Sequence, residues 1–174
     1  CVKVFTRADS KDGMDLGDLN EILSGAANVV WNEIKYKAEV EKRYGNLPAV
    51  HCMPSQINQV FMNLLVNAAQ SIQGHGEITI RTFVGEGCVV IEISDSGRGI
   101  PEESMKHLFE PFFTTKPVGE GTGLGLSIAR KIARLHGGDV TLESQFGSGT
   151  TVRFEMPPGR VAWATPAAAA GVAA

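Results

Sequence analysis

Cysteine is scarce in this sequence, and the few cysteines present form no metal-binding or disulfide pattern. There are three, Cys1, Cys52 and Cys88, and no two of them make a Cys-x-x-Cys pair. A disulfide framework or a structural zinc site needs paired or closely spaced cysteines, so neither is indicated. Cys52 and Cys88 lie in apolar segments, and we expect both to be buried, reduced thiols. The sequence therefore predicts a reducing, cytoplasmic setting.

Long apolar runs and an excess of charge are also absent. No stretch approaches the roughly 20 apolar residues that a membrane-spanning helix needs, and no signal sequence opens the chain. The formal net charge is -3, which argues against broad nucleic-acid binding. The 174 residues suit one domain with some chain left over. The chain begins at Cys1 rather than methionine, which suggests a fragment of something longer.

Hydrophobic periodicity divides the chain into three parts. We expect the end of a preceding helix and a polar linker over residues 1–17, a folded domain over 18–156, and an alanine- and proline-rich linker or disordered tail over 157–174. Apolar residues at helical spacing predict helices over residues 18–34, 54–72, 101–108 and 124–135. Segments rich in β-branched residues predict strands over residues 38–44, 47–52, 77–84, 88–95, 139–144 and 150–156.

The helix predicted over residues 54–72 carries an uncharged amide stripe beside its apolar face. The stripe consists of Gln56, Gln59, Asn63, Asn67 and Gln70, which are three or four residues apart and so share one face. A solvated face normally carries lysine and glutamate, which are better helix formers than asparagine. Amide oxygens bind hard cations and amide N–H groups bind phosphate oxygens, so Asn63 and Asn67 are candidate ligands. The alternative is a helix face that is merely polar.

The strand predicted over residues 88–95 ends in a carboxylate. Asp95 is followed by Ser-Gly-Arg-Gly-Ile100, so it lies at the rim of a sheet with little bulk around it. A carboxylate in this place accepts a hydrogen bond from an exocyclic amine such as that of adenine. A turn-forming aspartate explains the same residues equally well.

Alternate glycines from Gly119 to Gly125 run into the last predicted helix. They allow main-chain N–H groups to turn toward an anion, and the helix N-terminus adds positive potential at the same place. This arrangement predicts a phosphate site, with a flexible connection as the alternative. The preceding residues 109–123 have no clear period and favour a functional lid or a disordered loop. We expect Phe109, Phe112 and Phe113 to anchor this loop.

Five separate motifs in this order give the chain its resemblance to a known family. They are Asn63 with Asn67 and the segments over residues 95–100, 109–116, 119–126 and 146–151. With them, residues 18–156 resemble the ATP-binding catalytic domain of bacterial sensor histidine kinases. The resemblance implies a Bergerat fold, an α/β (α+β) two-layer sandwich with a mixed five-stranded sheet backed by three helices. ATP would lie between the helical layer and a mobile lid.

The resemblance also implies roles for single residues. Asn67 corresponds to the Mg²⁺ ligand, Asn63 to a phosphate contact and Asp95 to the residue that binds the adenine amino group. Lys116 is similar in place to a phosphate-neutralising cation and completes the implied catalytic set with Asn63 and Asn67. The other implied ATP contacts are Gly97, Gly99, Ile100, Phe109, Thr115, Gly119, Gly121, Thr122, Gly123, Leu124, Gly125, Leu126 and Thr150.

Two positions bear on mechanism. Gln70 stands where many relatives carry lysine, so Lys116 or Arg98 would have to supply the positive phosphate contact. Related ATPases carry glutamate at the position of Asn63 to activate water, and an amide cannot take that proton. The domain is therefore expected to hold and orient ATP and to leave the nucleophile to another component.

The family's nucleophile is a histidine on a dimeric helical hairpin. None of His51, His75, His107 and His136 lies in a similar motif, so the resemblance implies a separate histidine-bearing dimerisation domain and a response regulator receiver domain as partners. We expect this chain to be monomeric and the full-length protein to be a homodimer. The sequence does not decide whether the full-length protein is anchored in a membrane. Nucleic acid is not expected to be a partner. Two alternatives are a serine protein kinase of the anti-sigma-factor type and a nucleotide-sensing binding module on the same fold.

Overall fold

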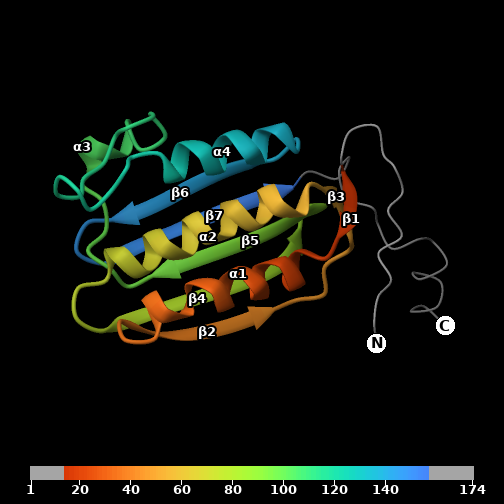
Figure 1. The fold of residues 1–174 in the computed structure, drawn as a ribbon, viewed down its shortest axis with the longest axis horizontal. Helices are drawn as coiled ribbons and strands as arrows, with labels where there is room; N and C mark the ends of the chain where they lie inside the picture. Colours follow the sequence, from red (N-terminus) through yellow and green to blue (C-terminus); the bar gives the residue numbers. More distant parts are fainter. Residues whose placement is uncertain (1–13, 157–174) are drawn as a thin grey trace.

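A mixed five-stranded sheet covered on one face by three helices forms most of residues 14–156, the part of the chain that the computed structural model describes. The helices are α1 (Leu19–Ile34), α2 (Pro54–Ser71) and α4 (Gly125–Leu135), and α2 lies between the other two (Figure 1). The predicted two-layer fold is confirmed. The predictions for residues 1–13 and 157–174 fall outside the described residues.

The sheet has the strand order β2-β4-β5-β7-β6. Only β2 and β4 pair in parallel, and the other three pairs are antiparallel. This places the end of β5 beside the start of β7, with Asp95 opposite Thr150. The strands are β2 (Ala38–Tyr44), β4 (Gly76–Gly85), β5 (Cys88–Asp95), β6 (Asp139–Gln145) and β7 (Gly149–Met156).

The apolar stripe of α2 is the centre of the core. Its inward side chains, Phe61 among them, are fully buried as the helical spacing predicts. Phe61 meets Phe154 of β7 edge to face, with ring centroids 5.5 Å apart. The helix begins at Pro54. Proline fits the first helical turn because the N–H groups there have no partner within the helix, so the N–H that proline lacks costs no hydrogen bond. This packing fixes which face of α2 is left for the amide stripe.

Two segments differ from the sequence prediction. Residues 15–17, expected in a linker, form β1 (Asp15–Gly17), which pairs with β3 (Val50–Cys52) in a separate two-stranded sheet. Three residues are too few to show a period. β3 is also shorter than predicted because Pro48 has no N–H to give to a ladder. The predicted helix over 101–108 is reduced to the single turn α3 (Glu102–Met105).

The two cysteines in the described part of the chain are free thiols in different surroundings. Cys52 is fully buried as expected, and burial raises the pKa of its thiol to about 11, so it stays protonated and unreactive. Cys88 begins β5 near the hairpin turn and is only partly buried, contrary to the prediction. No helix within residues 14–156 is both long and apolar enough to cross a bilayer.

Gly25 offers a test of how α1 is held. It lies exposed in mid-helix, and a Cβ added there meets nothing within 4 Å. Gly25→Ala is therefore expected to raise the free energy of unfolding by about 0.5–1 kcal/mol, because alanine loses less backbone entropy in a helix. Urea titration followed by circular dichroism measures the change.

Gly147 is the matched control for Gly25. It has equally open surroundings but a φ of 85°, so Gly147→Ala is expected to lower stability. A shift in the same direction for both variants would contradict this explanation.

Candidate functional site

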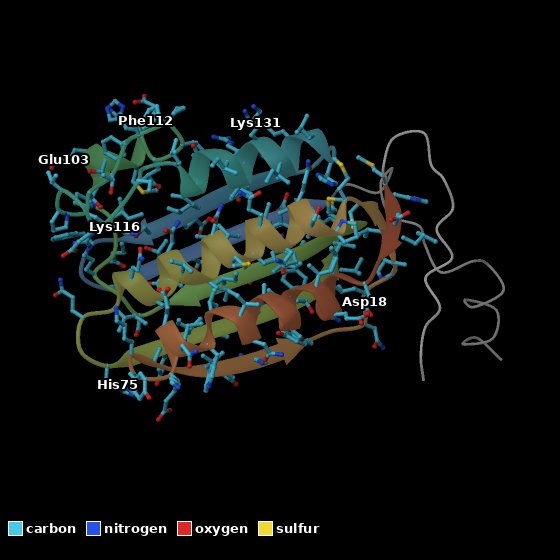
Figure 2. The ribbon with its side chains drawn as sticks, viewed as in Figure 1. Asp18, His75, Glu103, Phe112, Lys116 and Lys131 are labelled. Atoms are coloured by element: carbon cyan, nitrogen blue, oxygen red, sulfur yellow. The ribbon has the colours of Figure 1, made fainter. Side chains whose placement is uncertain are left out.

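A cavity of about 540 Å³ lies between α2, the ends of β5 and β7, and the loop before α4. This size is typical of a small-molecule site. We call residues 109–123 the lid, since they form one wall of the cavity through residues such as Phe113 and Gly121. Lys116, in the lid, lies near the C-terminal end of α2 (Figure 2). The cavity is thus enclosed by elements that are far apart in the sequence.

Most of the predicted site residues line this one cavity. They are Asn63, Asn67, Asp95, Gly99, Ile100, Thr115, Lys116, Gly119, Gly121, Thr122, Gly123, Gly125, Leu126 and Thr150. Residues from the loops 95–100 and 115–126 reach the same space as α2 because the sheet order brings the end of β5 under that helix.

Three of the predicted ATP contacts are not part of the cavity wall: Gly97, Phe109 and Leu124. Gly97 instead donates its main-chain N–H to Asp95 Oδ1 at 2.9 Å. Phe109 packs under the Arg130 guanidinium, 4.2 Å from its ring centroid, away from the cavity. Leu124 precedes α4 and its carbonyl accepts the N–H of Ile128. All three residues therefore lie outside the cavity wall.

Asp95 is the carboxylate at the α2 and β5 side of the cavity. Its Oδ1 accepts hydrogen bonds from Ser71 Oγ at 2.7 Å and from Gly97 N at 2.9 Å. Burial raises the pKa of the Asp95 carboxyl above its ordinary value, and hydrogen bonds from Ser71, Gly97 and Thr150 offset part of that rise. A partly buried acceptor held by three donors is well suited to bind an amine of a planar ligand.

The amide stripe of α2 contacts the lid through a cation. The Lys116 ammonium donates to Asn67 Oδ1 at 3.4 Å and also to Gln70 Oε1. Burial lowers the pKa of Lys116 below its ordinary value, and the nearby charges of Arg98 and Lys37 lower it further. Asn63 Nδ2 donates to the Gly125 carbonyl at 3.4 Å. The amide oxygens of Asn67 and Gln70 therefore accept a positive charge at the cavity wall.

Two parts of the lid, at Phe112 and Gly123, pack against each other, and this close approach requires a glycine. Gly123 has a φ of 69°, and a Cβ there would lie 2.3 Å from the Phe112 carbonyl carbon. The Phe112 N–H donates to the Gly123 carbonyl at 2.9 Å. Phe112 itself is 76% exposed, so its expected role as an apolar anchor is wrong. Its ring points to solvent because its own φ of 68° turns the chain there.

The start of α4 completes the opposite wall. Gly125 and Leu126 line the cavity, and the N–H groups of a first helical turn have no partner inside the helix. They lie beside the amide stripe, since a Cβ on Gly125 would be 3.6 Å from Asn67 Nδ2. Lys116 and Arg98 add positive charge to the same cavity. This end is therefore suited to an anion such as a polyphosphate.

Several residues that line the cavity were not predicted from the sequence. Ser71 lies one helical turn after Asn67, so helical spacing could have added it to the amide stripe. The apolar residues Leu142 and Val152 give no such local signal, because only the strand order brings them under α2, and Leu108 reaches the cavity from the loop after α3. The cavity thus combines a polar rim that the sequence predicts with an apolar wall that it does not.

Within residues 14–156, no group of three or more histidine, cysteine, aspartate or glutamate side chains could hold a metal ion by itself. Asn67 Oδ1 already takes a hydrogen bond from an ammonium group, so it accepts a cation in this geometry. Mg²⁺ commonly binds through one or two protein oxygens, with water and substrate phosphates filling the other positions. The residues present therefore fit a Mg²⁺ ion that arrives with a polyphosphate.

Comparison with known proteins shows which family this chain resembles. Residues 52–160 match the family model described as histidine kinase-, DNA gyrase B- and HSP90-like ATPase. The chain is 35% identical over 143 residues to the sensor histidine kinase ZraS of Escherichia coli strain K12, covering 80% of this chain and 30% of that protein. It is 36% identical over 157 residues to the sensor kinase CckA of Brucella abortus strain 2308, covering 82% of this chain and 16% of that protein.

A solved structure is similar over the whole domain. The catalytic domain of histidine kinase ThkA has a TM-score of 0.74 and 34% identity, and the match covers 84% of this chain and 98% of that one. The chain thus spans about a third or less of the two curated relatives and nearly all of the solved catalytic domain.

Proposed function

The chain belongs to the family of histidine kinase-, DNA gyrase B- and HSP90-like ATPases and, within it, to the catalytic domains of histidine kinases, and from this premise we propose that it binds Mg-ATP and positions the γ-phosphate for transfer to a histidine on a separate dimerisation domain. The observation that carries the proposal is one cavity with Asp95 on one side and Asn67, Lys116 and the first turn of α4 on the other.

The adenine end is formed by Asp95 and apolar neighbours. The carboxylate accepts the exocyclic amine, while side chains such as Ile93 and Val152 contact the base from the sheet side. Thr150, opposite Asp95 on β7, lines the same end. A flat apolar surface with one acceptor favours an aminopurine, because a keto oxygen opposite the carboxylate would leave two acceptors facing each other.

The phosphate end is formed by amides, a lysine and main-chain N–H groups. Asn63 Nδ2 and the first turn of α4 donate to phosphate oxygens, and Lys116 offsets their charge. Asn67 Oδ1 holds Mg²⁺, which supplies charge stabilisation to the phosphates when bound. On nucleotide binding the Lys116 ammonium exchanges its amide partners, Asn67 and Gln70, for phosphate oxygens. The lid glycines provide the freedom that this exchange needs.

The nucleophile comes from outside this domain. All four histidines lie within the described residues, and none of them lines the cavity. His136 is fully buried, with Nε2 accepting the Met53 N–H at 3.0 Å and Nδ1 at 2.8 Å from the Ile132 carbonyl. His51, His75 and His107 are exposed elsewhere. A histidine-bearing dimerisation domain of the full-length protein is the proposed acceptor of the γ-phosphate. A response regulator receiver domain is proposed to accept the phosphoryl group from that histidine.

Two measurements on the 174-residue chain test this function. Isothermal titration with ATP and ADP, with and without Mg²⁺, is expected to show saturable binding to a monomer. Labelled ATP is then supplied together with a histidine-bearing helical hairpin, and the label is expected on histidine of the hairpin only. Label on serine of a partner would favour an anti-sigma-factor type of kinase. Binding without any transfer would favour a nucleotide sensor, and absence of ATP binding would overturn the proposal.

A further inference from the structure

Ser71 occupies an unusual position at the end of α2. Its Oγ lies 2.7 Å from Asp95 Oδ1 and 2.8 Å from the Ala68 carbonyl oxygen. The side chain is partly buried and lines the cavity one helical turn beyond Asn67. The hydroxyl therefore joins the helix that carries the amide stripe to the strand that carries the carboxylate.

The Ser71 hydroxyl has two acceptors within hydrogen-bond distance and can donate to only one of them at a time. Serine has one hydroxyl proton, and an ionised carboxylate and a carbonyl oxygen are both acceptors only. The proton therefore goes to one of them, and a hydrogen bond to a charged acceptor is roughly twice as strong as one to a neutral carbonyl. Ser71 thus donates to ionised Asp95.

Two of the three hydrogen bonds to the Asp95 carboxylate end on the same oxygen, and the main chain of Thr150 supplies the third. Oδ1 accepts from Ser71 Oγ and from the Gly97 N–H. With Oδ1 held by Ser71 and Gly97, rotation of the carboxylate about its Cβ–Cγ bond is restricted, and Oδ2, on which neither of these bonds falls, is the oxygen that we assign to the ligand's amine.

Gly97 shows how closely this group is packed. A Cβ added there would lie 2.1 Å from Ser71 Oγ and 2.7 Å from Asp95 Oδ1. The position thus excludes any side chain, which explains why a glycine outside the cavity wall matters to the site. The contact of Ser71, Asp95 and Gly97 is built into the backbone, since the Arg98 N–H also donates to the Ser71 carbonyl at 3.0 Å.

We propose that Ser71 is a positioning residue for base recognition: its hydroxyl fixes the orientation of Asp95 so that one oxygen accepts the amine of an aminopurine and a 6-oxopurine is rejected. The inference rests on the proposed ATP site. A carboxylate free to rotate could instead accept the N–H groups of guanine, so the loss of Ser71 lowers discrimination more than it lowers binding in general.

The test compares ATP and GTP affinities of the 174-residue chain by isothermal titration. Ser71→Ala is expected to weaken ATP binding about tenfold, with GTP affinity unchanged or improved, so that the ratio of the two dissociation constants falls at least tenfold. Ser71→Thr keeps the hydroxyl and is expected to restore most of the ratio. Ser71→Cys, with a similar size and a weak donor, serves as the second variant if the alanine protein does not fold.

Ser94→Ala is the matched control. Ser94 Oγ is likewise partly buried and hydrogen-bonded, 2.8 Å from Thr151 Oγ1, but it makes no hydrogen bond to the Asp95 carboxylate and does not line the cavity. Its ratio should equal that of the wild type. An unchanged ratio in Ser71→Ala, or an equal loss of both nucleotides, would overturn the role of Ser71 while leaving ATP binding intact. A wild-type chain that binds no ATP would instead overturn the proposed function and this inference together.

Discussion

Asp95→Asn is expected to weaken ATP binding by about 100-fold or more while the domain stays folded. The amide oxygen can still accept from Ser71 and Gly97, which hold Oδ1 at 2.7 and 2.9 Å. The amide nitrogen then takes the place of Oδ2, the oxygen that we assign to the ligand's amine, so a donor meets the donor of the adenine amine. Two donors facing each other in a partly buried site leave both unpaired, and each unpaired group costs about 1–3 kcal/mol.

The measurement for Asp95→Asn is isothermal titration of ATP, with urea unfolding as the check on the fold. Glu92→Gln is the matched control, because it makes the same chemical change on the same strand. Glu92 lies three residues before Asp95, so it points to the opposite face of the sheet, where its neighbours are Arg81 at 3.8 Å and Arg153 at 4.0 Å. Unchanged ATP affinity in Asp95→Asn, or an equal loss in Glu92→Gln, would remove Asp95 from base recognition.

The polar parts of the site were predictable because their signals are local. The spacing of Asn63 and Asn67 alone places both on one face of a helix, and Asp95 ends a strand by its own pattern. The structure brings all three to one cavity. The period of a helix or strand determines on which face of that element a side chain lies. The faces of Asn63, Asn67 and Asp95 can therefore be predicted without knowledge of the fold.

The rest of the site depends on contacts between distant elements. Leu142 and Val152 face the cavity because β6 and β7 pair beside β5. A strand period cannot say which neighbour a strand will have. The prediction that Phe112 anchors the lid was wrong for a different reason. An aromatic residue in a loop suggests an anchor, but the positive φ of Phe112 and the turn at Gly123 direct the ring outward. Pairing and loop geometry are properties of the folded chain.

Asn67→Ala is expected to remove most of the benefit that Mg²⁺ gives to ATP binding and to lower phosphoryl transfer to a supplied histidine-bearing hairpin roughly 100-fold or more. Asn67 Oδ1 accepts a hydrogen bond from the Lys116 ammonium at 3.4 Å. The same oxygen is the proposed Mg²⁺ ligand, so its loss removes the oxygen that accepts a cation. ATP affinity without Mg²⁺ should change little, because Asp95 and the first turn of α4 are untouched.

The ratio of ATP affinities with and without Mg²⁺ separates this role from a general defect of the helix. Gln59→Ala is the control: Gln59 belongs to the same stripe on α2 but is exposed and is not part of the cavity wall. It should keep the Mg²⁺ effect of the wild type. An Asn67→Ala protein that retains the full Mg²⁺ effect would show that the ion is held by phosphates and water alone. In that case Asn67 would serve only to hold Lys116, and the transfer rate would follow the position of the lid rather than the metal.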